Sequence, residues 1–141
     1  MKQALYQAST VTFEEFSFIF PAERAAGSKI NAGDCLNVGI DFAGPLSGQF
    51  VLRIERDVLP AVAANMLGED APFEEEILRD VAGEIANVIC GNTLPAISGR
   101  DAVFNLSAPQ QLAPADVSAA PSAEANLEME EGRADVMLFI N

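Results

Sequence analysis

The sequence predicts an α+β domain in which long helices pack on one face of a mostly antiparallel sheet. Two pairs of short segments alternate apolar and polar residues across a turn, which is typical of β-hairpins. Two longer stretches repeat apolar residues at the helical period. The chain has 141 residues, 50% of them hydrophobic, which is enough for one sizeable core and too little for two. We therefore expect a single domain over residues 1–141.

The amino-terminal part predicts a helix, a loop and a hairpin. Apolar residues recur at a loose helical period over residues 4–20, and Pro21 closes that helix. Residues 25–34 contain two glycines and are typical of a loop. The segments 36–42 and 49–55 alternate apolar and polar residues on either side of a Gly-Pro turn. They predict a hairpin of two half-buried strands.

Two helices are expected next. Asp57 is expected to cap a helix that runs to about Leu67, with Gly68 as its stop. A longer helix is expected over residues 72–92, ending near Gly91 and Asn92. Three glutamates, 74–76, fall in its first turn, where the helix macrodipole favours negative charge.

The carboxyl-terminal part predicts one strand and a second hairpin. Residues 102–106 form the expected strand. Residues 108–125 are rich in Ala, Pro and Ser and predict a long connection with one short strand or turn of helix. The segments 126–130 and 134–140, joined around Gly132, predict the closing hairpin.

Composition excludes several classes of function. The net charge of −13 disfavours nucleic acid and acidic membrane surfaces, because binding phosphates requires clustered Lys and Arg. The chain has no His and two Cys, Cys35 and Cys90, so neither a zinc set nor a disulfide framework is expected. No apolar run or leader pattern predicts a membrane span or a signal peptide. We expect a cytoplasmic protein that binds neither membrane nor nucleic acid.

The long helix over residues 72–92 carries a polar stripe. Asp80, Glu84 and Asn87 follow one another at spacings of four and three, which places them on one side of a helix together with Gly83 and Gly91. The opposite arc is expected to be buried and consists of Ile77, Leu78, Val81, Ala82, Ile85, Val88 and Ile89.

The position of Gly83 is unusual, because glycine within a helix costs about 0.5 to 1 kcal/mol relative to alanine. A partner that approaches closely would explain it. The alternative for the whole stripe is that its polar side chains only solvate an amphipathic helix.

Asp80-x3-Glu84-x2-Asn87, within the run GEIANVICGN, resembles the signature of the CheC/CheX chemotaxis phosphatases. The likeness extends to residues 13–21 and 104–109. CheX is the closer relative in this CheC/CheX/FliY family, because CheC usually carries the motif twice and the chain holds one copy.

The resemblance implies a phosphatase whose substrate is the phosphoaspartate of a CheY-like response regulator, in chemotaxis or related two-component signalling. Glu84 and Asn87 are its expected catalytic residues. The Asn87 carboxamide can hold the attacking water without adding negative charge, since this reaction depends mainly on positioning. The resemblance implies that Glu84 pairs with a lysine of the receiver.

Asp80, Gly83 and Arg79 are expected at the partner-binding surface. Arg79 and Arg100 would offset the long-range repulsion between two acidic proteins, or else are ordinary surface charges. The protein is expected to have no cofactor or metal of its own, because the receiver supplies Mg²⁺.

Two other functions stay open at this point. One is a non-catalytic module that binds a receiver or sits in a signalling assembly. The other is a structural domain whose motif is fortuitous. The presence of both Glu84 and Asn87 favours the enzyme. A homodimer is also expected, because exposed edge strands invite pairing and CheX-like proteins are dimeric.

Overall fold

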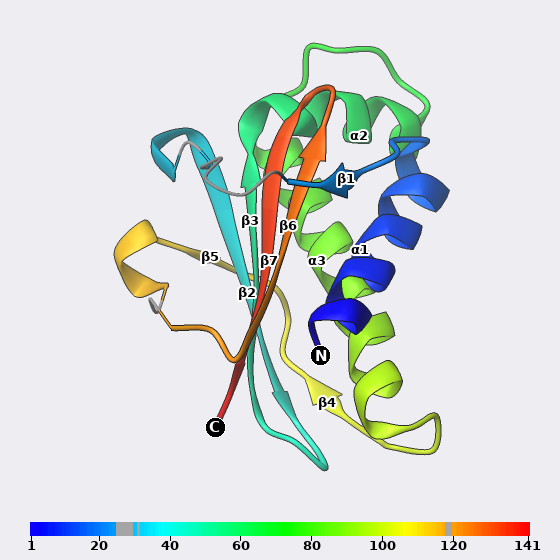
Figure 1. Ribbon diagram of the computed structural model, residues 1–141. Helices are drawn as coiled ribbons and strands as arrows, with labels where there is room; N and C mark the ends of the chain where they lie inside the picture. Colours follow the sequence, from blue (N-terminus) through cyan, green and yellow to red (C-terminus); the bar gives the residue numbers. More distant parts are fainter. Residues whose placement is uncertain (25–29, 31, 118–119) are drawn as a thin grey trace.

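In the described part of the chain, seven strands form one antiparallel sheet, and three α-helices cover one of its faces (Figure 1). This computed structural model describes residues 1–24, 30, 32–117 and 120–141. The strand order is β1–β6–β7–β3–β2, and β4 and β5 both pair with β2 at the far edge. The predicted α+β fold class, with helices on one face of an antiparallel sheet, is confirmed.

The three helices are α1 (Lys2–Ser17), α2 (Leu59–Leu67) and α3 (Glu75–Ser98). Both α1 and α2 pack against α3, and α3 also contacts β2 and β3. The predicted end of α2 is confirmed, since Gly68 adopts φ of 68° there. None of the helices in the described part of the chain is long and apolar enough to cross a membrane.

Three predictions about helix ends are wrong. The first helix does not run to residue 20 and Pro21, because Phe18 adopts a left-handed conformation that ends α1 at Ser17. Asp57 does not cap α2, because it lies within a 3-10 turn (Arg56–Val58) that leads into the helix, and α2 begins without a side-chain cap. Nor does α3 end near Gly91. It continues past Pro95 to Ser98 because Thr93 and Leu94 are buried. Pro95 leaves the Gly91 carbonyl without its helical donor, and the exposure of Gly91 keeps that carbonyl near water.

Both predicted hairpins are confirmed, and each is longer than expected. Strand β3 pairs with β2 on one side and β7 on the other, which joins the two hairpins into a continuous sheet. Alternate residues of these strands point towards the helices and form the core, as a period of two requires. The strands are β1 (Ala22–Glu23), β2 (Cys35–Ala43), β3 (Gly48–Glu55), β4 (Asn105–Leu106), β5 (Gln110–Leu112), β6 (Ala123–Met129) and β7 (Gly132–Ile140).

Two predicted connections fall partly outside the described residues. Of the predicted loop over residues 25–34, residues 25–29 and 31 lie outside, and Ala32–Asp34 forms a 3-10 turn that enters β2. Of the connection over residues 108–125, residues 118–119 lie outside. Its described part holds the short strand β5 and a 3-10 turn (Pro114–Asp116).

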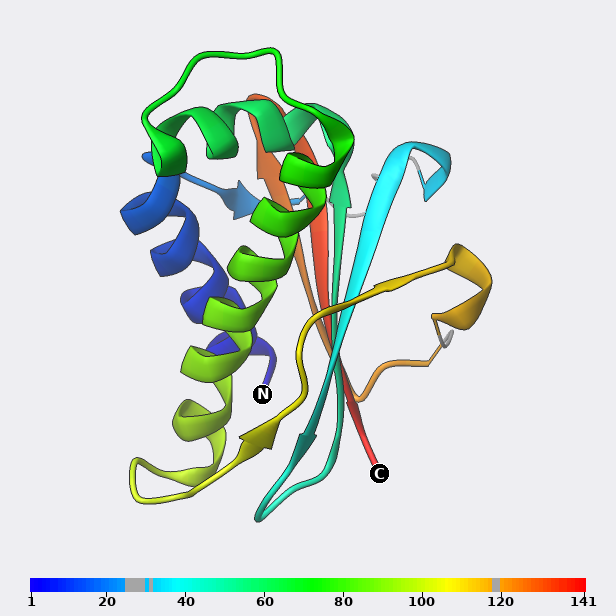
Figure 2. The ribbon, with the colours of Figure 1, turned by 180° about the vertical axis from the view of Figure 1, so that it is seen from behind.

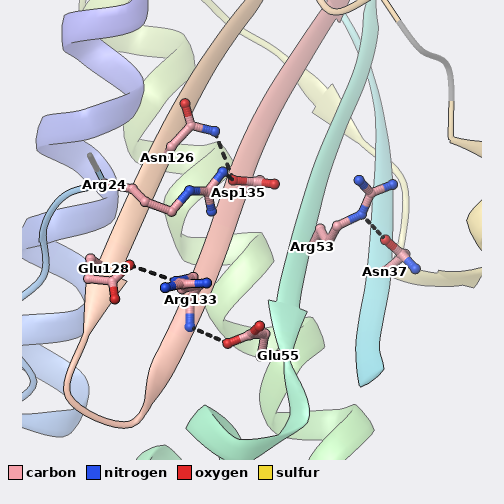
Figure 3. A network of polar contacts seen from close by, with 8 residues as sticks. All are labelled: Arg24, Asn37, Arg53, Glu55, Asn126, Glu128, Arg133 and Asp135. Carbon is pink, nitrogen blue, oxygen red and sulfur yellow. Dashed lines mark hydrogen bonds and ion pairs between the residues drawn. The ribbon is translucent and has the colours of Figure 1, made fainter. Parts of the chain in front are cut away.

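Polar side chains join neighbouring strands on the sheet face away from the helices (Figure 3). Arg24, just after β1, reaches β7, where its Nη2 lies 2.6 Å from Asp135 Oδ1. The Asn126 side chain donates to the same Asp135 oxygen at 2.8 Å. The Arg24 and Asp135 side chains are only 8% and 5% exposed. Arg24 therefore ties the sheet edge to β7 through a buried ion pair.

Removing Asp135 tests this ion pair. Asp135→Ala leaves the Arg24 guanidinium buried without its counter-charge, so the free energy of unfolding should fall by about 3 to 5 kcal/mol. The matched control is Glu128→Ala, because Glu128 pairs with Arg133 at 2.9 Å with both side chains about 40% exposed. An exposed pair contributes about 1 kcal/mol or less. Urea unfolding curves measure both variants, and equal losses would contradict a special role for the buried pair.

Candidate functional site

Most of the polar stripe predicted on α3 faces solvent. Asp80 and Glu84 are exposed, and Asn87 is partly exposed. Of the arc expected to be buried, Val81, Ala82, Ile85 and Ile89 are buried, whereas Ile77, Leu78 and Val88 are only half-buried. Within the described part of the chain, neither Glu84 nor Asn87 has a side-chain hydrogen-bond partner. Their Cβ atoms lie about 5 to 6 Å apart, as for any pair three residues apart on a helix. An open carboxylate and an open carboxamide therefore stand one turn apart.

Gly83 does not lie on the exposed stripe, which corrects the prediction. It is buried, and a Cβ atom built on it would lie 3.3 Å from Pro109 Cβ. The close neighbour that accounts for a glycine here is thus a residue of the same chain, Pro109, and the role of Gly83 in partner binding stays a prediction. Gly91, two turns further along α3, is exposed and would place its Cβ in open space.

A bulge in the edge strand carries Pro109 to α3. Phe42 of β2 pairs with Leu106, and Gly39 pairs with Gln110. Two residues of β2 therefore lie opposite the three residues 107–109, and such an extra residue bends the strand. Ser107 fixes the bend, because its N–H donates to the Asp41 carbonyl at 2.8 Å and its Oγ accepts from the Asp41 N–H at 2.9 Å. The strand predicted over residues 102–106 is shorter than expected, because only Asn105 and Leu106 pair with β2.

A groove runs between α3 and the bent edge strand, which lie side by side in Figure 2. Its wall on α3 is acidic, and its other wall is formed by Pro109 and Gln111. Asn87 follows Gly83 by four residues and so lies one turn beyond the groove on the same side of α3. The groove has a volume of about 420 Å³ and is lined by Glu76, Arg79, Asp80, Gly83, Glu84, Pro109 and Gln111.

Arg79 is the one basic side chain that lines the groove in the described chain. Its Nε lies 3.4 Å from Glu75 Oε1, and Glu75 also accepts a hydrogen bond from Arg56. That bond, together with the charges of both arginines, lowers the pKa of the exposed Glu75 carboxyl. Glu75 is therefore ionised at neutral pH and holds Arg79 at the amino-terminal end of the groove. Arg100, by contrast, follows the end of α3 and does not line the groove.

Three groove residues were not predicted to belong to the site. For Glu76 the sequence predicts only a favourable charge in the first turn of the helix. Its position four residues before Asp80, however, places it on the same side of α3. Pro109 and Gln111 reach the groove through the bulge, which no local pattern in the sequence indicates.

A larger hollow of the described structure lies elsewhere. It has a volume of about 650 Å³ and lies between the β2–β3 turn and the end of β7. None of the residues predicted for the site lines it. In the described chain, moreover, no three His, Cys, Asp or Glu side chains lie together as metal ligands. The open acid–amide pair therefore places the candidate site on α3.

The α+β fold and the acid–amide pair on its long helix define a class of protein. Comparisons with known proteins identify this class. A family described as "Chemotaxis phosphatase CheX" matches residues 37–130, more than half of the chain. The chain belongs to the CheX family, and the predicted resemblance is confirmed. A comparison with curated proteins finds no match.

Solved CheX structures share the fold at low sequence identity. A CheX from Desulfovibrio desulfuricans has a TM-score of 0.76 at 19% identity, with 99% of this chain and 97% of that one covered. A CheX from Vibrio vulnificus has a TM-score of 0.79 at 14% identity, with 99% and 95% covered. A CheX–CheY–BeF3–Mg complex from Borrelia burgdorferi has a TM-score of 0.69 at 15% identity, with 97% and 96% covered.

The contact between Gly83 and Pro109 can be tested with two substitutions in one helix. Gly91→Ala should raise the free energy of unfolding by about 0.5 to 1 kcal/mol, because alanine is the better helix former and the site is open. Gly83→Ala should show no such gain, because the new methyl group would press on Pro109. Chemical unfolding measures both variants. An equal gain at Gly83 would show that the edge strand does not constrain α3.

Proposed function

We propose that the protein is a phosphatase that hydrolyses the aspartyl phosphate of a CheY-like response-regulator receiver domain. Membership of the CheX family supports this, and the CheX of Borrelia burgdorferi forms a complex with CheY. The observation that carries the proposal is the open pair Glu84 and Asn87 on α3, beside a groove with an acidic wall. The pair is free of internal hydrogen bonds in the described chain and is thus available to another molecule.

Asn87 positions the attacking water in this proposal. The water oxygen attacks phosphorus in line as the bond from phosphorus to the aspartate oxygen breaks, and the aspartate carboxylate leaves. An acyl phosphate is already activated, so the enzyme contributes mainly geometry. The Asn87 carboxamide can accept a hydrogen bond from the water or donate one to it. It adds no negative charge beside the phosphoryl group, which a carboxylate would repel.

Glu84 anchors the receiver. Its exposed carboxylate, one turn before Asn87, pairs with a lysine beside the receiver's phosphorylation site. Asp80 and Arg79 contact the rim of the same surface, and Gly83 lets Pro109 form the opposite wall. Any Mg²⁺ required is held by the receiver's own acidic residues, because Mg²⁺ prefers one or two carboxylates together with phosphate oxygens.

The Asn87→Ala variant tests the chemistry. Alanine preserves the helix and leaves Glu84 in place, so the complex should still form. Loss of the positioned water should slow dephosphorylation by about 10²-fold, measured as phosphate release from a phosphorylated receiver. The control is Asn92→Ala, an exposed asparagine of α3 that lines a separate hollow against α1, and it should retain full activity. Unchanged activity in Asn87→Ala would contradict the role given to Asn87, whereas a wild-type protein that binds the receiver without accelerating phosphate release would favour the non-catalytic receiver-binding module.

The Glu84→Lys variant tests docking separately. Reversing the charge places a lysine opposite the receiver's lysine, so the dissociation constant for a receiver bearing beryllium fluoride and Mg²⁺ should rise at least tenfold. Calorimetry gives the constant, and circular dichroism should show an intact fold because position 84 is exposed. Asp70→Lys, an equal change of charge in the exposed α2–α3 connection, is the control. Equal weakening by both substitutions would attribute the effect to net charge alone.

We also propose that the chain forms a homodimer. Strand β1 covers only the end of β6, pairing with Leu127 and Glu128. In the described chain this leaves the start of β6 without a neighbouring strand on that side, and an open edge can pair with a second copy. Sedimentation at tens of micromolar should show a dimer, and a monomer at that concentration would reject the proposal.

A further inference from the structure

Two phenylalanines lie exposed where α1 ends. The Phe18 and Phe20 side chains are each 72% exposed, whereas Ile19 between them is 6% exposed and belongs to the core. No ring contact joins either phenylalanine to another aromatic side chain in the described chain. Burying such a side chain is favourable, and the fold of the described chain leaves both largely in water.

The backbone of Phe18 adds to the anomaly. Phe18 adopts φ of 55° and ψ of 27°, the left-handed conformation that ends many helices. Glycine normally occupies this position, because a Cβ atom is strained there. The same chain ends α2 in this way with Gly68, whose φ is 68°. The backbone of Phe18 is thus strained, and its side chain, which is mostly exposed, does not offset that strain through burial.

A small hollow lies between these rings and the β6–β7 turn. Its volume is about 170 Å³, which is room for one side chain. The carboxylates of Glu130 and Glu131 have no ion-pair or hydrogen-bond partner among the described residues. The hollow is lined by Phe18, Ile19, Phe20, Glu130 and Glu131.

We propose that this hollow binds an arginine side chain of a partner protein. A guanidinium is planar and weakly hydrated, so it can stack on an aromatic ring while its N–H groups bind carboxylates. The two phenylalanines and two glutamates supply both kinds of contact around one small space. An aliphatic partner would leave the carboxylates unpaired, and an anion would be repelled by them.

The arginine comes from a different protein. Most described basic side chains of this chain already have an acidic or amide partner, and Arg100 lies beyond the other end of the helical layer. A second copy would present chiefly carboxylates, because each chain carries a net charge of −13. The engaged side chains are Lys2, Arg24, Arg53, Arg56, Arg79 and Arg133.

An NMR titration tests the proposal, with the dipeptide analogue N-acetyl-arginine-methylamide as the probe. Amide shifts should localise at residues 18–20 and 130–131, and the analogue in which neutral citrulline replaces arginine should not reproduce them. Glu130→Gln combined with Glu131→Gln should weaken probe binding about fivefold or more. The control is Glu69→Gln with Asp70→Asn, because this exposed acidic pair does not line the hollow beside the two phenylalanines. Shifts spread over the whole acidic surface, or equal binding of the citrulline probe, would overturn the proposal.

Substitution of Phe18 separates binding from folding. Phe18→Gly relieves the left-handed strain, so the melting temperature should rise by about 3 °C while probe binding at this hollow is lost. Phe20→Ala should reduce binding with little change in melting temperature. Val103→Ala removes another exposed side chain, 77% exposed, and should leave binding unchanged. If Phe18→Gly lowered the melting temperature or kept full binding, Phe18 would have a structural role and the proposal would be wrong.

Discussion

The contact between Gly83 and Pro109 sets the distance between α3 and the edge of the sheet, and the site depends on that distance. Any residue larger than glycine at position 83 would place its Cβ against the proline ring. Pro109 can approach because an extra residue bends the edge strand, and Ser107 fixes that bend through two hydrogen bonds to the Asp41 backbone. A pairing error of one residue at this edge would move Pro109 and Gln111 away from the acidic wall of α3. The groove beside the acid–amide pair therefore depends on a packing contact formed by two segments 26 residues apart in the chain.

Electrostatics constrain how this surface meets another acidic protein. The net charge of −13 repels an acidic receiver over distances of about 8 Å at physiological ionic strength. Attraction must then come from matched charges within the interface. In the proposed complex, Glu84 would offer a carboxylate to a lysine and Arg79 a cation at the other end of the groove. Because Glu75 holds Arg79 in place, this cation occupies a defined position at a modest cost in conformational entropy.

The sequence predicts the sheet and the motif helix because both follow from local periodicity. The strands on either side of Pro45 and Gly132 alternate apolar and polar residues, and one side of α3 is apolar through Ile85 and Ile89. The burial of Gly83 and the length of α3 were not predicted, because both depend on tertiary contacts. Gly83 is buried by a proline from another segment, and α3 passes Gly91 because Thr93 and Leu94 fill the core. Burial of such side chains outweighs the weak helix-breaking preference of one exposed glycine.

The same distinction applies to the candidate site. Spacing alone places Asp80, Glu84 and Asn87 on one side of a helix, and the resemblance to CheX supplies their proposed roles. Neither reveals the groove, whose second wall is formed by the bent edge strand. The most direct test of the central claim is the decay rate of a phosphorylated CheY-like receiver, followed by stopped-flow fluorescence against increasing concentrations of this protein. The rate should rise above spontaneous hydrolysis and saturate as the complex fills. A receiver whose phosphoryl group decays at the spontaneous rate, although the complex forms, would contradict the account.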